Sequence, residues 1–276
     1  MKKLIVIGDL FEDSLTCQEI KSATEGFLKS PHDIDISFVT STPSTIHTSF
    51  LINQIVQTEE YLGRPIETVI FHNTDPRVHT KNSTIKAEGA LPLIVKLKSG
   101  IYLTGPNSGY SYSMIKDKTD IVFEYKGLNV HGQFHSRDLY SRIAAHLMDY
   151  LEDEMELEET GMDTIPDLKG YYIGHIDNFG NIKTTITHSE LKGKYEYGEI
   201  IRVKINGITK QVKYVTNLFG GTPGELVIYP GSSGKQDDRY LEITIWRHFT
   251  EEKPTTGAFE FNLPKVGSLI EILSSR

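Results

Sequence analysis

The sequence predicts a protein of two parts, an α/β domain with a mostly parallel sheet followed by an all-β domain. In the first half, short apolar runs alternate with segments of helical spacing, which is typical of a parallel sheet covered by helices. After Pro166 the apolar segments are short and β-like. We therefore expect the α/β domain over residues 1–163 and the all-β domain over residues 164–276.

The spacing of apolar residues places the elements of the first domain. The expected helices are Leu15–Leu28, Phe50–Tyr61 and a longer one that begins after Ser136. The expected strands are the short apolar runs Leu4–Ile7, Ile34–Val39, Val69–Phe71, Leu91–Leu97, Ile101–Leu103 and Ile121–Tyr125. Segment 152–159 has six acidic residues in eight positions, and we expect a solvated face or linker there rather than a metal site.

The second domain is expected to consist of short strands joined by turns. Asn206-Gly207 lies between two of these strands and is typical of a tight hairpin. The strand candidates are Tyr171–Ile176, Ile182–Ile186, Ile200–Ile205, Ile208–Val212, Leu226–Tyr229, Leu241–Trp246 and Leu269–Leu273.

Composition narrows the class of protein. The chain has 276 residues, of which 38% are hydrophobic and 24% charged, so it can bury a full core without disulfides. Its single cysteine, Cys17, excludes disulfide scaffolds and cysteine-rich zinc sites. No apolar run reaches the about 18 residues that span a bilayer, and the net charge of -8 argues against a general nucleic-acid binder. We expect a cytoplasmic protein with neither a membrane nor a nucleic-acid partner.

Several common catalytic motifs are absent from the sequence. Gly8-Asp9-Leu10 stands where a dinucleotide-binding G-x-G-x-x-G would follow the first strand. No G-x-S-x-G elbow and no H-E-x-x-H zinc motif occurs anywhere in the chain. The sequence therefore predicts no metal site and no hydrolase triad of the α/β type.

Three polar residues of the first domain lie at positions where α/β proteins bind ligands. Asp9 and Asp75 each follow a predicted strand, and ligands bind at the carboxyl ends of strands in open sheets. Asp9 could equally cap the next helix or turn, and Asp75-Pro76 could be a plain turn. His135 precedes the long helix, where it could be functional or a structural histidine.

In the second domain a carboxylate, an aromatic ring and an amide lie within five residues, as Asp177, Phe179 and Asn181. Together they suit a purine-bearing amine, because the amide can pair with the base edge, the ring can pack on the base, and the carboxylate can hold an ammonium or hydroxyl group. The alternative is a plain Asx-rich turn. Ser232 and Ser233 offer hydroxyl and backbone N–H groups to a carboxylate, or form only a loop.

The order of these segments carries more information than any one of them. The first domain has four segments similar to motifs of one family. Gly8-Asp9-Leu10-Phe11 is similar to T-D-F-G, and Asp75 through Asn82 is similar to D-P-G-V-G-T-x-R. Pro106-Asn107-Ser108-Gly109 is similar to P-D-N-G, and Phe134 through Asp138 is similar to F-H-G-R-D. In the second, D-x-F-G-N, P-G-E-L and S-S-G with a later L-E are found at Asp177 to Asn181, Pro223 to Leu226, Ser232 to Gly234 and Leu241-Glu242. The chain thereby resembles the S-adenosyl-L-methionine (SAM) hydroxide adenosyltransferase family, whose relatives are SAM-dependent chlorinases and fluorinases.

This resemblance implies an α/β N-terminal domain and an all-β, barrel-like C-terminal domain, assembled as a homotrimer with the ligand between subunits. It implies hydrolysis of SAM to adenosine and L-methionine by attack of water or hydroxide on C5′. No cofactor or metal is expected, because the sulphonium already makes methionine a good leaving group. By resemblance the catalytic residues are Asp75 and His135, which handle the water. The implied substrate-binding residues are Asp9 for the ribose, Asp177, Ser232 and Ser233 for methionine, Phe179 and Asn181 for adenine, and Asn82.

Asn82 departs from the family motif, which has an arginine at that position. The change removes a guanidinium that would fix the neighbouring carboxylate and tune its pKa, unless Arg77 takes its place. The alternative to an enzyme is therefore a non-catalytic SAM- or adenosine-binding protein. A halide-using enzyme is a third reading, less favoured because His135 in its F-H-x-R-D context resembles the hydrolytic branch.

Overall fold

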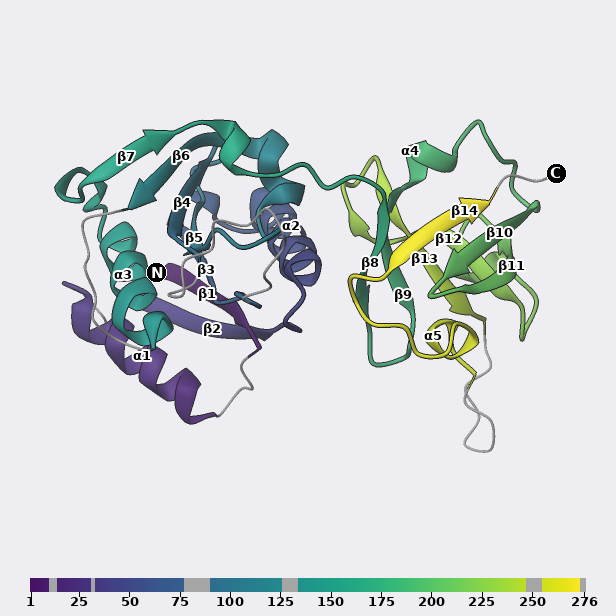
Figure 1. The fold of residues 1–276 in the computed structure, drawn as a ribbon, viewed down its shortest axis with the longest axis horizontal. Coiled ribbons are helices and arrows are strands. Elements are labelled where there is room, and N and C mark those ends of the chain that lie inside the picture. Colours follow the sequence, from purple (N-terminus) through teal and green to yellow (C-terminus); the bar gives the residue numbers. More distant parts are fainter. Residues whose placement is uncertain (10–13, 31–32, 77–89, 126–133, 247–254, 274–276) are drawn as a thin grey trace. The chain divides into compact units, whose positions relative to one another are not determined.

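The computed structural model of the chain describes residues 1–9, 14–30, 33–76, 90–125, 134–246 and 255–273 (Figure 1). The chain divides into two compact units, Met1–Leu168 and Lys169–Arg276. The first unit continues past residue 163, because Ile165 is fully buried in its core. Among the described residues, no helix is long and apolar enough to cross a membrane.

The first unit contains a seven-stranded sheet in the order β2-β1-β3-β5-β4-β6-β7. The strands are β1 (Lys2–Gly8), β2 (Ile34–Thr40), β3 (Thr68–His72), β4 (Pro92–Leu97), β5 (Tyr102–Pro106), β6 (Thr119–Tyr125) and β7 (Leu157–Thr160). Neighbours from β2 to β5 run parallel, whereas the pairs β5–β4, β4–β6 and β6–β7 are antiparallel.

The expectation of a mostly parallel sheet is not confirmed, since the sheet is mixed. The reason lies in the connection between β4, which ends at Leu97, and β5, which begins at Tyr102. A parallel crossover needs about a dozen residues or more, so this short connection permits only an antiparallel pair. The acidic segment is a solvated face, as expected, and part of it forms the edge strand β7 rather than a linker. Glu158 and Glu159 are exposed on that strand, and charges of this kind protect a sheet edge from further pairing.

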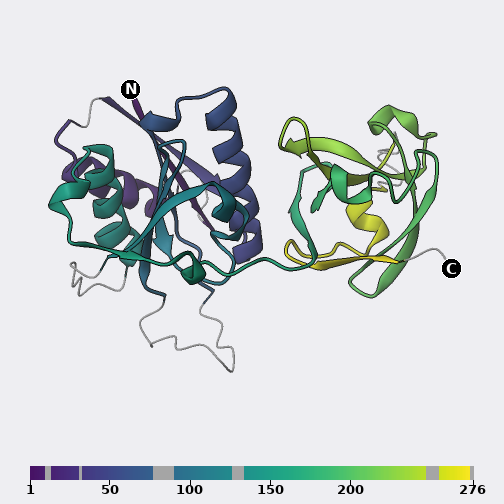
Figure 2. The same ribbon diagram turned by 90° about the horizontal axis from the view of Figure 1, so that it is seen from above.

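Helices cover both faces of this sheet (Figures 1 and 2). They are α1 (Leu15–Phe27), α2 (Thr45–Tyr61) and α3 (Ser141–Met148), the last preceded by a π-helical turn, η4 (Ser136–Tyr140). Side chains alternate along β1, so Leu4 and Val6 pack in one cluster with α1 and α3, while Ile5 and Ile7 pack in another with α2. Helix α2 starts earlier than predicted because the Ser44 side chain accepts a hydrogen bond from the backbone of His47 and caps it.

The second unit is a closed barrel in the strand order β10-β11-β12-β13-β9-β8-β14 (Figure 1). Its strands are β8 (Tyr171–Ile176), β9 (Ile182–Thr187), β10 (Ile200–Ile205), β11 (Ile208–Tyr214), β12 (Leu226–Gly234), β13 (Arg239–Ile245) and β14 (Leu269–Leu273). Two single-turn helices, α4 (His188–Leu191) and α5 (Gly257–Glu260), accompany them, so the unit is mostly β. The predicted hairpin is confirmed, with φ of 50° at Asn206 and 79° at Gly207 between β10 and β11.

His72, the last residue of β3, is a buried histidine next to the polar end of the sheet. It is 1% exposed, its ring meets Tyr112 edge-on with centroids 4.9 Å apart, and its Nδ1 accepts the Thr74 N–H at 3.4 Å. Gly105 lies against the ring, and a Cβ there would come within 2.7 Å of His72 Nε2. Burial lowers the pKa of His72 to about 3.

His72 should make the stability of the first unit depend on pH. Between its ordinary pKa of about 6.5 and its folded value, the unfolded chain binds a proton that the folded chain rejects. The free energy of unfolding should therefore fall as the pH drops below about 6.5, by roughly 1.4 kcal/mol per pH unit from this group. Urea unfolding followed by helical circular dichroism should show a shallower pH slope for His72→Gln. An unchanged slope would contradict this assignment.

Candidate functional site

Polar residues gather where the parallel strands of the first unit end. Asp9 directly follows β1, Pro43 comes soon after β2, and Asn73 to Pro76 follow β3. Strand β1 lies between β2 and β3, so the chain moves to one side of β1 and then to the other. Ligands of open α/β sheets bind at such a switch point, outside the carboxyl ends of the strands.

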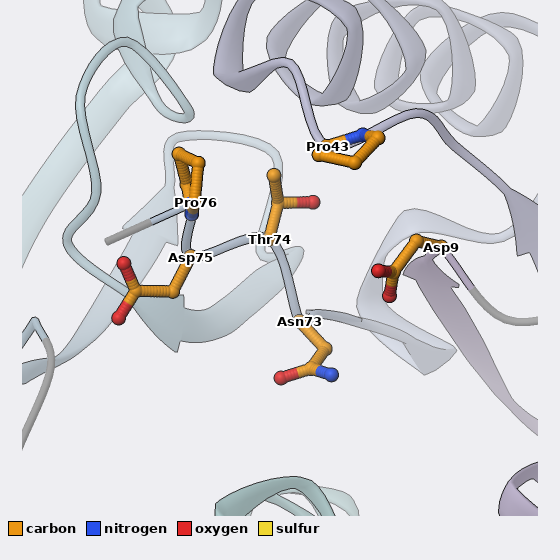
Figure 3. Close-up of a pocket in the computed structure, with 6 residues that line it drawn as sticks. All are labelled: Asp9, Pro43, Asn73, Thr74, Asp75 and Pro76. Carbon is orange, nitrogen blue, oxygen red and sulfur yellow. The ribbon is translucent and has the colours of Figure 1, made fainter. Parts of the chain in front are cut away.

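These strand ends enclose a cavity of about 270 Å³. Figure 3 shows the Asp9 carboxylate directed toward the segment that follows β3, and the Asp75 carboxylate on the other side of that segment. The structure thus brings two of the predicted site residues, Asp9 and Asp75, to one cavity. Its described lining consists of Asp9, Pro43, Asn73, Thr74, Asp75 and Pro76.

The segment after β3 is fixed by hydrogen bonds to its neighbours. The Asn73 N–H donates to the Ile7 carbonyl of β1 at 2.8 Å. The hydroxyl groups of Thr74 and Thr48 lie 2.6 Å apart, which ties the segment to α2. Thr74 is 3% exposed, so its hydroxyl serves the fold, and Asn73 and Asp75 on either side of it are the groups that can meet a ligand.

Two neutral groups donate hydrogen bonds to the Asp75 carboxylate. Its Oδ2 accepts the Ala90 N–H at 3.0 Å, and its Oδ1 accepts the Ser108 hydroxyl at 3.5 Å. Burial, and then the charge of Asp75, raise the pKa of the Tyr140 phenol. Donors of this kind orient a carboxylate, and an oriented carboxylate can accept a proton from a water or hydroxyl group.

His135 stands at the start of η4 and is not among the described residues that line the cavity. The rest of its motif fixes the helix start. The Arg137 guanidinium donates to both carboxylate oxygens of Asp138, at 2.6 and 3.1 Å, and to Glu19 of α1 at 3.0 Å. The carboxylates of Asp138 and Glu19 raise the pKa of Arg137. π-Helical turns are frequent at functional sites. In this turn, Arg137 and Asp138 form ion pairs that fix the start of the helix, which is a structural role.

Asn82 and Arg77 lie outside the residues that the structure describes, as do the residues directly after Asp9. Within the described part of the chain, no group of three or more His, Cys, Asp or Glu side chains could hold a metal ion.

In the second unit, the segment from Asp177 to Asn181 forms an Asx turn between β8 and β9. Asp177 Oδ1 accepts the N–H groups of Phe179 and Asn181, both at 3.0 Å, and Oδ2 accepts the Asn181 side-chain amide at 2.9 Å. Asn181 Oδ1 in turn accepts the Thr244 hydroxyl of β13. These three hydrogen bonds leave the Asp177 carboxylate about one of its four acceptor positions. The Phe179 side chain is 72% exposed.

A buried carboxylate that the sequence analysis did not single out lies beneath Ser232. Glu242 of β13 is 4% exposed, and its Oε1 accepts the Ser232 N–H at 2.8 Å and the Ser232 hydroxyl at 2.9 Å. The Lys183 ammonium of β9 donates to the same oxygen at 2.6 Å, and the Tyr229 phenol donates to Oε2 at 3.2 Å. Burial by itself would raise the pKa of Glu242, but the hydrogen bonds from Lys183 and Ser232 more than offset it and lower the pKa.

Glycine at position 231 makes room for this carboxylate. Strand β12 bulges between Pro230 and Gly234, and a Cβ on Gly231 would lie 2.3 Å from Glu242 Cδ. Ser233, the other predicted serine, is 4% exposed. The only sequence signal for this cluster is the L-E pair at Leu241-Glu242, whose partner Lys183 is far away in the chain.

The fold and these sites define a two-domain protein, with carboxylates at the switch point of an α/β sheet and a polar turn and bulge on a barrel. A family model described as the SAM hydroxide adenosyltransferase C-terminal domain matches residues 171–246, which contain that turn and bulge. The chain is also 34% identical over 154 residues to a protein of Methanocaldococcus jannaschii named (R)-S-adenosyl-L-methionine hydrolase. That match covers 52% of this chain and 54% of the relative, so the chain spans about half the length of this curated relative. The resemblance to the SAM hydroxide adenosyltransferase family is confirmed.

Solved structures support the fold alone. A crystal structure of an uncharacterized conserved protein from Thermotoga maritima is similar with a TM-score of 0.72 at 19% identity, over 98% of this chain and all of that chain. A conserved hypothetical protein from Thermus thermophilus is similar with a TM-score of 0.66, also at 19% identity, over 99% of this chain and 100% of that chain.

Proposed function

We propose that the protein hydrolyses SAM to adenosine and L-methionine. The observation that carries this proposal is the pairing of two findings: a cavity lined in part by Asp9 and Asp75 at the switch point of the first unit, and a match of residues 171–246 in the second unit to the SAM hydroxide adenosyltransferase C-terminal domain. The name of the Methanocaldococcus relative adds a stereochemical preference, the (R) form of SAM.

In the proposed reaction, the oxygen of water attacks C5′ of SAM. The bond between C5′ and the sulphonium sulfur breaks, its electron pair stays on sulfur as the thioether of methionine, and the proton lost by the water passes to Asp75 or His135. Support for Asp75 is its place at the cavity, with the Ala90 N–H and the Ser108 hydroxyl holding its two oxygens. Asp9 would accept hydrogen bonds from the ribose hydroxyls, as a carboxylate at the end of β1 can.

The second unit would hold the remainder of SAM. Support for Phe179 as an adenine contact is its exposed ring, which can pack on a purine face. Asp177 would use its remaining acceptor position for the methionine ammonium, while Asn181 would hold the turn in shape and present its edge to adenine. By the family resemblance, Ser232 and Ser233 would contact the methionine part of SAM, and Asn82 would be a further substrate-binding residue.

The proposal also covers the oligomeric state, the location, the partners and the cofactor requirement of the protein. By its family resemblance the protein would be a homotrimer with the ligand between subunits, located in the cytoplasm, with small-molecule SAM or adenosine rather than nucleic acid or membrane as its partner. It would use no cofactor or metal, because the sulphonium leaving group already departs as a neutral thioether.

The direct test is incubation with each sulphonium epimer of SAM, followed by chromatography for adenosine and methionine. We expect equimolar adenosine and methionine, faster release from the (R) epimer, and no loss of rate after a metal chelator is added. Binding of adenosine with no release of it from either epimer would contradict the proposal and favour the non-catalytic binding protein.

Asp9 and His135 should affect different steps. Asp9→Ala should weaken adenosine binding, because a buried ligand hydroxyl without its acceptor costs roughly 1–3 kcal/mol. His135→Ala should lower turnover at saturating SAM and change the binding constant little, since a group that handles water acts mainly in the transition state. Calorimetry with adenosine and initial rates with SAM separate the two. A His135→Ala protein that binds no adenosine but turns over its residual complex normally would refute these roles.

Asn82→Arg should raise the rate of SAM hydrolysis. An arginine beside Asp75 would form a charge-assisted pair, fix the carboxylate and position the water, and a positioned acid–base group contributes about 10²–10⁴-fold. The comparison variant is Arg77→Ala. If Arg77 already fills the arginine's role, Arg77→Ala removes native activity and Asn82→Arg is neutral or harmful. Inactivity of the native protein and of Asn82→Arg, with adenosine still bound, would overturn the enzyme assignment.

A further inference from the structure

A row of polar side chains crosses four neighbouring strands on the outside of the barrel. In the strand register His175 of β8 pairs with Lys183 of β9, Lys183 pairs with Glu242 of β13, and Glu242 pairs with Tyr229 of β12. Residues paired in this way point to the same face of a sheet. The adjacent Ile182 belongs to the barrel core, so the row faces outward. Nevertheless Glu242 and Tyr229 are buried, beneath the bulge of β12.

Both hydrogen-bond donors of Ser232, its hydroxyl and its backbone N–H, are used by Glu242. Glu242 is ionised, as its lowered pKa requires, so it only accepts, and the hydroxyl proton of Ser232 must be the one donated to it at 2.9 Å. The Lys183 ammonium only donates, so the Ser232 oxygen accepts from it at 2.8 Å. The backbone N–H of Ser232 is also donated to Glu242. Ser232 therefore retains no proton for a ligand carboxylate.

Lys183 does retain one. Of its three N–H groups, one is donated to Glu242 and one to Ser232, and the third has no acceptor within the part of the chain that the structure describes. Its side chain is 15% exposed, against 5% for its partner Glu242, so the ammonium lies at the edge of the cluster rather than beneath it. Glu242 and Ser232 hold the ammonium in place, which lowers the entropy cost of binding to it.

A second cation lies beside the same serine. The Arg239 guanidinium donates to the Ser232 carbonyl at 3.0 Å and has further N–H groups. Ser232 is thus flanked by Lys183 on its hydroxyl and Arg239 on its carbonyl. Glu242, the carboxylate paired with Lys183, already has both of its oxygens in hydrogen bonds. Burial and the charge of Lys183 lower the pKa of His175 in the same row, and the charge of Asp177 acts in the opposite direction.

We propose that Lys183 receives the carboxylate of the amino-acid part of the substrate, and that Ser232 and Glu242 are positioning residues that aim its ammonium group. This assignment rests on the proposed function, in which the substrate is SAM and its methionyl carboxylate needs a partner. It differs from the expectation from the family resemblance, in which the serine hydroxyls take that carboxylate themselves.

The test compares SAM with decarboxylated SAM, which keeps the sulphonium and the ammonium but lacks the carboxylate. Dissociation constants are measured on ice with the full chain, and any turnover is monitored as released adenosine. A charged hydrogen bond of this kind corresponds to about tenfold to a hundredfold in affinity. We expect the native protein to prefer SAM by that factor, and Lys183→Met to bind the two ligands within about twofold of each other.

Matched variants separate recognition from folding. Lys204→Met is the control, because Lys204 of β10 also forms an ion pair on the barrel, with Glu271 at 2.9 Å, and should keep the native preference. Lys183→Met leaves Glu242 buried without its cation, so the double variant Lys183→Met/Glu242→Gln is made alongside and should lose the preference too. Lys183→Arg should restore part of it, and Ser232→Ala should reduce the preference without abolishing it.

Two results would overturn the proposal, and they differ from each other. If the native protein prefers SAM and both Lys183 variants, single and double, keep that preference, Lys183 is not the carboxylate partner, and the proposed function stands. If the native protein binds neither ligand, the proposed function fails and the assignment of Lys183 fails with it.

Discussion

The cavity of the first unit depends on the parallel pairing of β1 with β2 and β3. The ladder continues one residue beyond the strands on both sides, since the Ser41 N–H donates to the Gly8 carbonyl at 2.5 Å and the Asn73 N–H donates to the Ile7 carbonyl at 2.8 Å. This pairing carries Asp9 and the segment after β3 to the same edge of the sheet, although α1 and α2 lie between them in the chain. The helices cover the two faces of the sheet, and the residues at this edge lie where open α/β sheets bind ligands.

In the second unit, the buried carboxylate of Glu242 fixes the positions of the polar groups around it. Glu242 would be costly to bury alone, and the loss of a partner from such a pair costs about 3–5 kcal/mol. Lys183, the Ser232 N–H and hydroxyl, and the Tyr229 phenol together satisfy it. A cluster that satisfies one internal carboxylate also fixes the direction of every donor around it. The geometry of the bulge is therefore set by electrostatics, whereas the cavity of the first unit is set by backbone pairing.

In the proposed function these two arrangements suit different parts of one substrate. SAM has neutral hydroxyls and a reacting carbon at one end, and an ammonium and a carboxylate at the other. The carboxylates Asp9 and Asp75 of the first unit suit hydroxyl groups and water, because they only accept hydrogen bonds. The second unit offers an acceptor at Asp177 and a donor at Lys183, which suit the charged amino-acid part.

The sequence by itself determined what depends on neighbours along the chain. The strands, the Asn206-Gly207 hairpin and the positions of Asp9 and Asp75 after strands were predictable, because a period of two and a turn dipeptide are local signals. The mixed sheet was not, although the short connection from β4 to β5 contained the signal. Only the tertiary structure decided that the Ser232 hydroxyl donates its proton to Glu242, and that the Lys183 ammonium lies beside Ser232. That contact depends on the register of β9 against β13, and a slip of one residue would turn Lys183 into the barrel core.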